Sequence, residues 1–151
     1  MANKELDLLL VEDDDVDIIN VKRSLKKLNL LNPIHTACDG LEALSLLRGT
    51  ETTPPIPIPT LILLDINMPR MNGLEFLREL RSDQRLRNLR VVVLTTSDEE
   101  KDIIEAYKFH VAGYILKPVL PEKFFEAIVA IENYWRLCEN ITPERLHPFR
   151  T

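Results

Sequence analysis

The strongest constraint on the fold is a series of short aliphatic runs that alternate with segments of helical spacing. The five runs expected to form strands are Leu6–Val11, Ile34–Ala37, Thr60–Leu64, Arg90–Leu94 and Tyr114–Leu116. The first, third and fourth are apolar at nearly every position, which is typical of parallel strands covered on both faces. Helices are therefore expected on both sides of the sheet.

Between the runs, apolar residues recur at intervals of three and four, which indicates amphipathic helices. The recurring positions are Ile18, Val21, Leu25 and Leu28 behind Asp14 and Asp15; Leu41, Leu44 and Leu47; Leu74, Leu77 and Leu80 behind Gly73; Ile103, Ile104, Tyr107 and Val111 behind Ser97 and Asp98; and Phe124, Ile128, Ile131 and Trp135 within 122–137, with Pro121 in the first turn. Strand and helix thus alternate five times, which requires right-handed crossovers. The predicted fold is an α/β, doubly wound sheet of five parallel strands.

Length and composition narrow the class of protein. A chain of 151 residues suits one domain, expected at 1–138 with a short tail at 139–151. The net charge of −5 disfavours nucleic acid or anionic lipid as a partner. No apolar stretch approaches the roughly 20 residues of a membrane span, and the N-terminus is unlike a signal peptide. Cys38 and Cys138 form no metal or redox motif, so we expect a soluble protein of the reducing cytoplasm.

Residues 52–59 lie outside the alternating pattern, because four of these eight residues are prolines. Proline excludes a helix there and favours an extended, semi-rigid connection. We expect a surface spacer before the third strand.

Side chains that can carry chemistry stand where the runs end. They are Glu12, Asp13 and Asp14 after the first run, Asp65 after the third, Thr95 and Thr96 after the fourth, and Lys117 after the fifth. Singly, each has an ordinary explanation, since acids favour helix N-termini and the others are common at strand ends or on surfaces. Parallel strands, however, end at the same edge of a sheet, and ligands bind beyond that edge. One shared site is therefore predicted.

The residue types at this edge indicate a particular chemistry. Carboxylates so close together repel, and without compensation at least one would be neutral at pH 7. A hard divalent cation such as Mg²⁺ removes the conflict. Lys117 can pair with Asp65 or hold a phosphoryl oxygen, and an aspartate can be a nucleophile. The combination predicts a phosphoryl-transfer site.

Four motifs at these strand ends carry a resemblance to a known family. LLLVEDD, LILLDINMPRMNG, VVVLTTS and GYILKP resemble the receiver domain of two-component response regulators, which has a flavodoxin-like fold, over about residues 5–133. The resemblance implies that Asp65 accepts a phosphoryl group from a phosphohistidine of a sensor histidine kinase. It also implies a Mg²⁺ site made by Glu12, Asp13, Asp65 and the backbone carbonyl of Asn67, with Glu12 acting mainly through water.

The resemblance also assigns the residues that respond to the phosphoryl group. Thr95 and Lys117 would contact its oxygens, and Tyr114 would swing inward when Thr95 is drawn to the phosphate. The peptide bond between Lys117 and Pro118 is expected to be cis.

Two assignments have an alternative in the adjacent residue. The acidic pair could be read as Asp13 and Asp14, although the start of the first strand favours Glu12 and Asp13. Thr95 and Thr96 form a similar doublet, in which counting from the last strand residue favours Thr95.

Further features resemble a subgroup of the family. The acids of EDDDVDII, the proline-bearing insert, VVVLTTSDEEKDI and Tyr134–Trp135 resemble the stand-alone regulators that partner bacterial phytochrome histidine kinases. Such a kinase is the expected partner, and output is expected through protein contacts or onward phosphotransfer. The face formed by the fourth helix, fifth strand and fifth helix is the candidate surface for those contacts, including a homodimer. The candidate anchors, most of which have a core position as the alternative, are Tyr107, His110, Phe124, Tyr134 and Trp135.

Two other functions fit parts of the pattern. A small phosphatase with an aspartyl-phosphate intermediate would use Asp-x-Asp, whereas Asp65-Ile66-Asn67 lacks the second carboxylate that would act as general acid. At most, slow self-dephosphorylation is expected. A phosphorylation-independent interaction module is disfavoured because the acids, the acceptor and the lysine are all retained. The four glycines form no nucleotide-binding loop.

Overall fold

The five predicted strands form one parallel sheet. The structure, a computed structural model, describes residues 7–27, 34–96 and 100–138, apart from some side chains near the end of the last helix. Its elements are β1 (Leu8–Val11), α1 (Asp15–Lys27), β2 (Ile34–Ala37), α2 (Gly40–Arg48), β3 (Leu61–Asp65), α3 (Gly73–Ser82), β4 (Val91–Thr95), α4 (Glu100–Tyr107), β5 (Gly113–Leu116) and α5 (Pro121–Cys138). The strands lie in the order β2-β1-β3-β4-β5. The predicted doubly wound α/β fold is confirmed.

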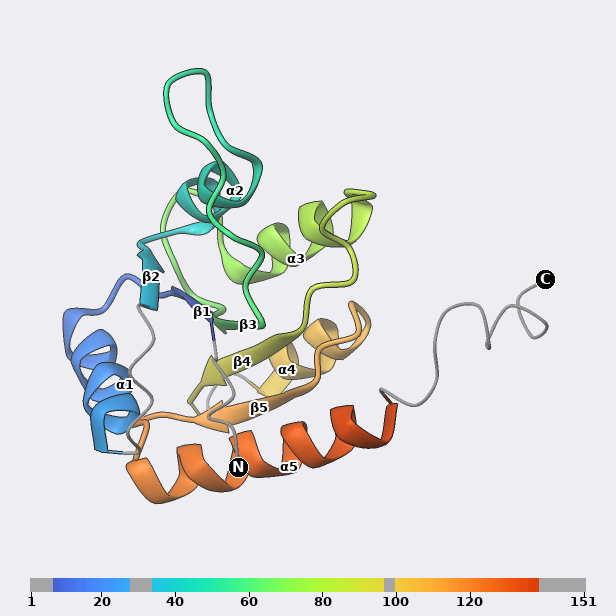
Figure 1. Ribbon diagram of the computed structural model, residues 1–151. Helices are drawn as coiled ribbons and strands as arrows, with labels where there is room; N and C mark the ends of the chain where they lie inside the picture. Colours follow the sequence, from blue (N-terminus) through green and yellow to red (C-terminus); the bar gives the residue numbers. More distant parts are fainter. Residues whose placement is uncertain (1–6, 28–33, 97–99, 139–151) are drawn as a thin grey trace, which may run out of the picture.

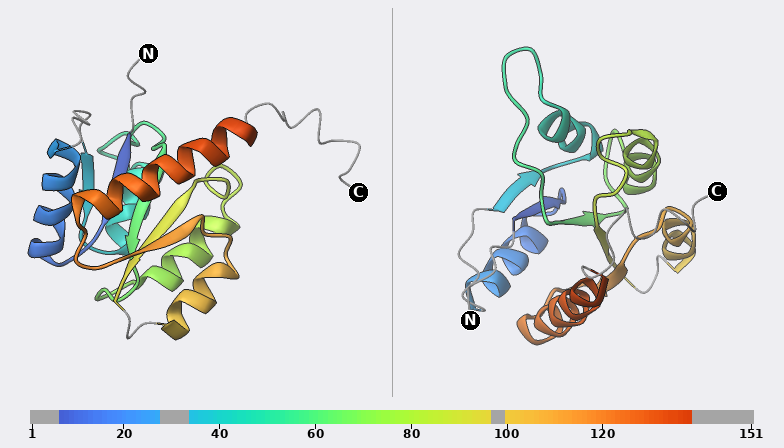
Figure 2. Two further views of the ribbon diagram at one scale, coloured as in Figure 1. Left: turned by 90° about the horizontal axis from the view of Figure 1, so that it is seen from below. Right: turned by 45° about the vertical axis from the view of Figure 1, so that its right-hand side comes forward.

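Helices cover both faces of the sheet (Figures 1 and 2), with α1 and α5 on one face and α2, α3 and α4 on the other. Successive strand residues point to opposite faces. Leu8 and Leu10 therefore pack with Phe124 of α5, whereas Leu9 and Val11 pack with Phe76 of α3. All residues of β1, β3 and β4 are buried, as their uninterrupted apolar runs predict. None of the helices in the described ranges is long and apolar enough to cross a membrane.

Two strands run one residue further than the sequence predicts. Asp65 is still in β3, where it is registered with Leu94, and Thr95 is still in β4, where it is registered with Leu116. The pairing continues because the neighbouring strands extend equally far. Both side chains thus belong to the rigid ends of strands rather than to the loops beyond them. Leu6, the predicted first residue of the first strand, lies outside the described residues.

Helix α4 is shorter than its apolar spacing predicts. It ends at Tyr107, and Val111, predicted as its last apolar position, is buried beyond the turn that follows. His110 has a positive φ of 59°, which turns the chain out of the helix. Ile104 and Tyr107 are exposed, and Ala106 is the buried residue of this helix. The predicted caps Ser97 and Asp98 lie outside the described residues.

Two further expectations about side chains change. Leu41 of α2 is exposed, because Gly40, Ala43, Leu44 and Leu47 provide the buried face of that helix. Phe124, a candidate dimer anchor, is fully buried in the core against the sheet, so that prediction is wrong. The side chains of Ile131, Tyr134 and Trp135 lie outside the description.

The proline-bearing segment is a projecting connection between α2 and β3, as predicted (Figure 1). Ile56 attaches it to the body. The backbone N–H of Ile56 donates to the carbonyl of Leu46 at 2.9 Å, and the Ile56 side chain packs against the core that α2 and α3 share. The tail at 139–151 lies outside the described residues.

Arg81 at the end of α3 joins two loops of the fold. Its guanidinium donates to the carbonyls of Phe109 (2.7 Å), Arg87 (2.8 Å), Leu89 (2.6 Å) and His110 (3.2 Å). The loops are those that follow α3 and α4. Burial lowers the pKa of this guanidinium, although arginine stays charged at any ordinary pH.

We expect Arg81→Met to lower the free energy of unfolding by about 2 kcal/mol, because four backbone carbonyls lose a charged donor. Urea denaturation followed by circular dichroism measures this loss. Arg78→Met, at an exposed position of the same helix, is the matched control. Equal losses in the two variants would show that the hydrogen bonds of Arg81 add nothing to the free energy of unfolding.

Candidate functional site

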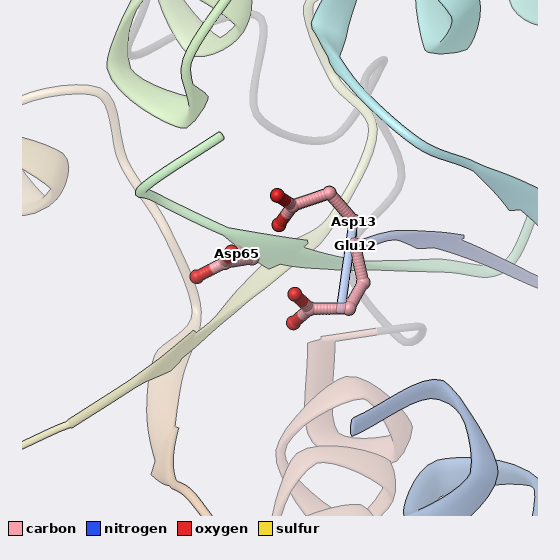
Figure 3. A group of neighbouring side chains, drawn as sticks. All are labelled: Glu12, Asp13 and Asp65. Carbon is pink, nitrogen blue, oxygen red and sulfur yellow. The ribbon is translucent and has the colours of Figure 1, made fainter. Parts of the chain in front are cut away.

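Three carboxylates meet at the carboxyl edge of the sheet, as the strand ends predict. Glu12 and Asp13 follow β1, and Asp65 ends β3. Figure 3 shows the three side chains pointing into the same space, and one oxygen from each lies within 4.8 Å of the others. Glu12 and Asp65 are buried, whereas Asp13 is exposed. The cluster is thus open to solvent on the side of Asp13.

Lys117, which follows β5, brings a positive charge to the buried side of this cluster. Its Nζ lies 3.0 Å from Glu12 Oε2 and 3.1 Å from Asp65 Oδ1. Burial alone would lower the pKa of the ammonium, but pairing with these carboxylates raises it above its usual value. The predicted contact between Lys117 and Asp65 is therefore present.

The surroundings of Glu12 change the pKa of its carboxyl group. Burial, followed by the charge of Asp65, raises the pKa of Glu12 to about 8 despite the nearby Lys117. The second of these causes is the like-charge conflict that the sequence predicts for the strand ends. A hard divalent cation with oxygen ligands relieves such a conflict, and three carboxylates within reach of one another fit that kind of ion.

Asp14 does not belong to the cluster. Its Oδ1 accepts from the backbone N–H groups of Val16 (2.8 Å) and Asp17 (3.1 Å), which caps the first turn of α1. The backbone N–H of Asp14 in turn donates to Glu12 Oε1 at 3.2 Å. Glu12 and Asp13, rather than Asp13 and Asp14, thus stand with Asp65.

The two threonines take different positions. Thr95 is fully buried, and its hydroxyl donates to the carbonyl of Thr96 at 3.1 Å. Thr96 is half-buried and lines the cleft above the acids, together with Asn67 and Lys117. The structure thus brings Thr96, rather than Thr95, into the cleft wall.

Tyr114 lies away from the cleft. Its side chain is 47% exposed and lines a surface groove beside Leu116 and Leu120. The inward movement of Tyr114 stays a prediction. The Lys117–Pro118 peptide bond is cis, which confirms the prediction.

The loop between β3 and α3, which carries Asn67, is held close to Asp65. A side chain at Gly73 would place its Cβ 2.6 Å from the backbone oxygen of Asp65, so this close approach requires glycine. The backbone N–H of Gly73 donates to the carbonyl of Ile66 at 2.8 Å. Asn72 then caps α3 in a reciprocal pair of hydrogen bonds with Glu75.

The same loop is tied to the start of α2. Arg70 Nε donates to the buried Asp39 carboxylate at 2.6 Å, and Gly40 N–H donates to the carbonyl of Met71 at 3.0 Å. Burial acts to raise the pKa of Asp39, but hydrogen bonds from the first turn of α2 and the Arg70 guanidinium together hold it below its usual value. Arg70 adopts a positive φ of 62° here.

Sequence reasoning did not include Asp17 in the site. Its Oδ2 lies 3.0 Å from Lys117 Nζ, from the first turn of α1. The available signal was that Asp17 lies in the first turn of the helix that follows the first strand, close in sequence to Glu12 and Asp13.

We expect Asp13→Asn to weaken binding of a divalent cation by about 10- to 100-fold, since it removes one of three neighbouring carboxylates. Isothermal titration with Mg²⁺ or Mn²⁺ measures this. Asp15→Asn changes the net charge equally but lies outside the cluster, so its affinity should stay near that of the wild type. Equal weakening in both variants would contradict a cation held by Asp13.

Comparison with known proteins agrees with this geometry. The family model described as the response regulator receiver domain matches residues 8–129. The response regulator Rcp1 of Synechocystis is 37% identical over 128 residues, which cover 85% of this chain and 87% of Rcp1. A solved structure of Rcp1 is described as the Mn²⁺-bound form; it is 36% identical with a TM-score of 0.68, covering 86% of this chain and 94% of Rcp1.

Two further solved structures are similar to this chain. The bacteriophytochrome response regulator RtBRR is 38% identical with a TM-score of 0.74, covering 83% of this chain and 77% of its own. The phosphorylated cyanobacterial phytochrome response regulator RcpA is 36% identical with a TM-score of 0.73, covering 87% and 94%. The chain therefore belongs to the response regulator receiver domain family and is related to phytochrome response regulators.

Proposed function

We propose that this protein is a phosphorylatable signalling switch in which Asp65 accepts a phosphoryl group from a phosphohistidine of a sensor histidine kinase. The observation that carries the proposal is the position of Asp65, a buried carboxylate beside Glu12, Asp13 and Lys117 at the carboxyl edge of the sheet. A nucleophilic carboxylate beside an ammonium and a cation-binding cluster is suited to phosphoryl transfer.

In the transfer, an oxygen of Asp65 forms the new bond to phosphorus while the bond from phosphorus to the histidine nitrogen breaks. Lys117, already 3.1 Å from Asp65 Oδ1, is placed to pair with an oxygen of the incoming group. Mg²⁺, held by Glu12, Asp13, Asp65 and the carbonyl of Asn67, would neutralise negative charge on that group. The hydroxyl of Thr95 is proposed to contact an oxygen of the phosphoryl group.

The product of the transfer is the phosphorylated protein itself, which acts as a signal, and no metabolite is released. Phosphorylation adds up to about two negative charges beside the end of β4. We propose that Thr95 and Tyr114 transmit this change to the face formed by α4, β5 and α5. A phosphatase is disfavoured because position 67 is Asn, which offers no general acid.

The kinase partner that we propose is a bacterial phytochrome, and the place of action is the cytoplasm. Support for the partner comes from the relatives RtBRR and RcpA, whose descriptions name them as response regulators of phytochromes. We propose neither nucleic acid nor a membrane as a partner, because the chain is acidic overall.

The output surface that we propose supports homodimerisation through α4, β5 and α5. Ile104, Tyr107, Tyr114 and Leu116 are large apolar side chains that are exposed on α4 and β5. Exposed apolar side chains gathered on neighbouring elements are typical of interaction surfaces. A second copy of the chain would bury them.

The first test is intact-protein mass spectrometry after incubation with acetyl phosphate, with and without Mg²⁺. We expect one Mg²⁺-dependent phosphoryl adduct on the wild type and none on Asp65→Asn, because the amide cannot form the acyl phosphate. Circular dichroism shows whether the variant is folded. An adduct on folded Asp65→Asn would move the acceptor elsewhere, and no adduct on the wild type would favour the phosphorylation-independent module.

The dimer surface is tested by sedimentation velocity on the phosphorylated protein. Ile104→Glu should weaken dimerisation by at least about tenfold, because it places a charge in the proposed apolar interface. Ile19→Glu, on α1, is the matched control, since Ile19 is 52% exposed and Ile104 58% exposed. Loss of the dimer in the Ile19 variant alone would place the interface on α1.

A further inference from the structure

Asp17 makes a contact that the proposed transfer does not use. Its carboxylate lies 3.0 Å from Lys117 Nζ, the same distance as Glu12 and slightly closer than Asp65 at 3.1 Å. The Asp17 side chain is 16% exposed, so water screens this pair only partly. It reaches Lys117 from α1, whereas the other two acids reach it from the ends of β1 and β3.

The three ion pairs leave no carboxylate-free side near the donors of Lys117 that face the acids. An ammonium has three N–H donors and no acceptor, and three carboxylate oxygens lie at hydrogen-bond distance from it. A phosphoryl oxygen on Asp65 can therefore be bound by Lys117 only if one of the present contacts is given up or shared.

The three acids differ in what they do once a cation and a phosphoryl group are present. Glu12 belongs to the group that can hold a cation, which would offset its negative charge, and Asp65 loses its carboxylate charge when its oxygen bonds to phosphorus. Asp17 is outside that group, and Lys117 is the cation with which it pairs. Asp17 is thus the acid that still pairs with Lys117 when a cation and a phosphoryl group are bound.

We propose that Asp17 is a positioning residue that competes with the phosphoryl group on Asp65 for Lys117, and so limits the stability of the phosphorylated state. This inference rests on the proposed function. The carboxylate holds the ammonium toward α1 in the unphosphorylated protein. It also repels the negative charge that phosphorylation adds. Replacing Asp17 with a neutral residue frees Lys117 for the phosphoryl oxygens.

The test is titration with beryllofluoride, a mimic of the phosphoryl group, at saturating Mg²⁺ and with fluorine NMR as the readout. We expect Asp17→Asn to bind the mimic about fivefold more tightly than the wild type, the scale of one partly exposed ion pair. Asp17→Glu, which restores a carboxylate, should return the affinity toward that of the wild type. Damage to the structure would instead weaken binding.

Asp15→Asn is the matched control for net charge. Asp15 is exposed in the first turn of the same helix and lines the same cleft, but it makes no ion pair among the described residues. Its affinity should stay near that of the wild type. An Asp17→Asn variant that binds no more tightly than Asp15→Asn overturns the competition alone, whereas a wild type that binds no beryllofluoride overturns the proposed function as well.

Discussion

The site depends on one partly buried ammonium that pairs with carboxylates from three separate elements. Lys117 is within 3.1 Å of Glu12, Asp17 and Asp65, which come from the end of β1, from α1 and from the end of β3. Without it, two buried carboxylates would face each other in a medium of low polarity, which is costly. Burial and the charge of Asp65 raise the pKa of Glu12 to about 8 even with Lys117 beside it. A divalent cation held by the three carboxylates would offset this penalty on their charged forms.

Several contacts also fix the backbone around Asp65. Gly73 lets the start of α3 approach the backbone oxygen of Asp65 more closely than any side chain would allow. Arg70 then joins the loop to Asp39 at the start of α2, and Arg81 joins the far end of α3 to the turns after α3 and α4. The loop that carries Asn67 is thus held by Gly73 at the start of α3 and by Arg70, neither of which belongs to the acidic cluster.

Much of the fold could be predicted because burial on both faces leaves a plain pattern. LLLV, LILL and VVVL have no polar positions, and only a covered parallel strand accommodates such runs in a chain with this many charges. Helix α4 was harder to predict. The spacing of Ile103, Ile104, Tyr107 and Val111 is that of a core-facing helix, but Ile104 and Tyr107 are exposed and Val111 lies beyond the helix. Exposed apolar residues on a helix can follow the same spacing as residues in a core.

The sequence by itself determined the alternation of strands and helices, and with it the gathering of Glu12, Asp13, Asp65 and Lys117, because parallel strands end at one edge. Only the tertiary structure decided that Asp14 caps a helix, that Thr96 lines the cleft while Thr95 is buried, and that Asp17 reaches Lys117. The reason is physical. The parallel direction of the strands follows from unbroken apolar runs that alternate with helices. The order of the strands and the direction of a side chain depend on how the elements pack and on where each one ends, which that pattern does not specify.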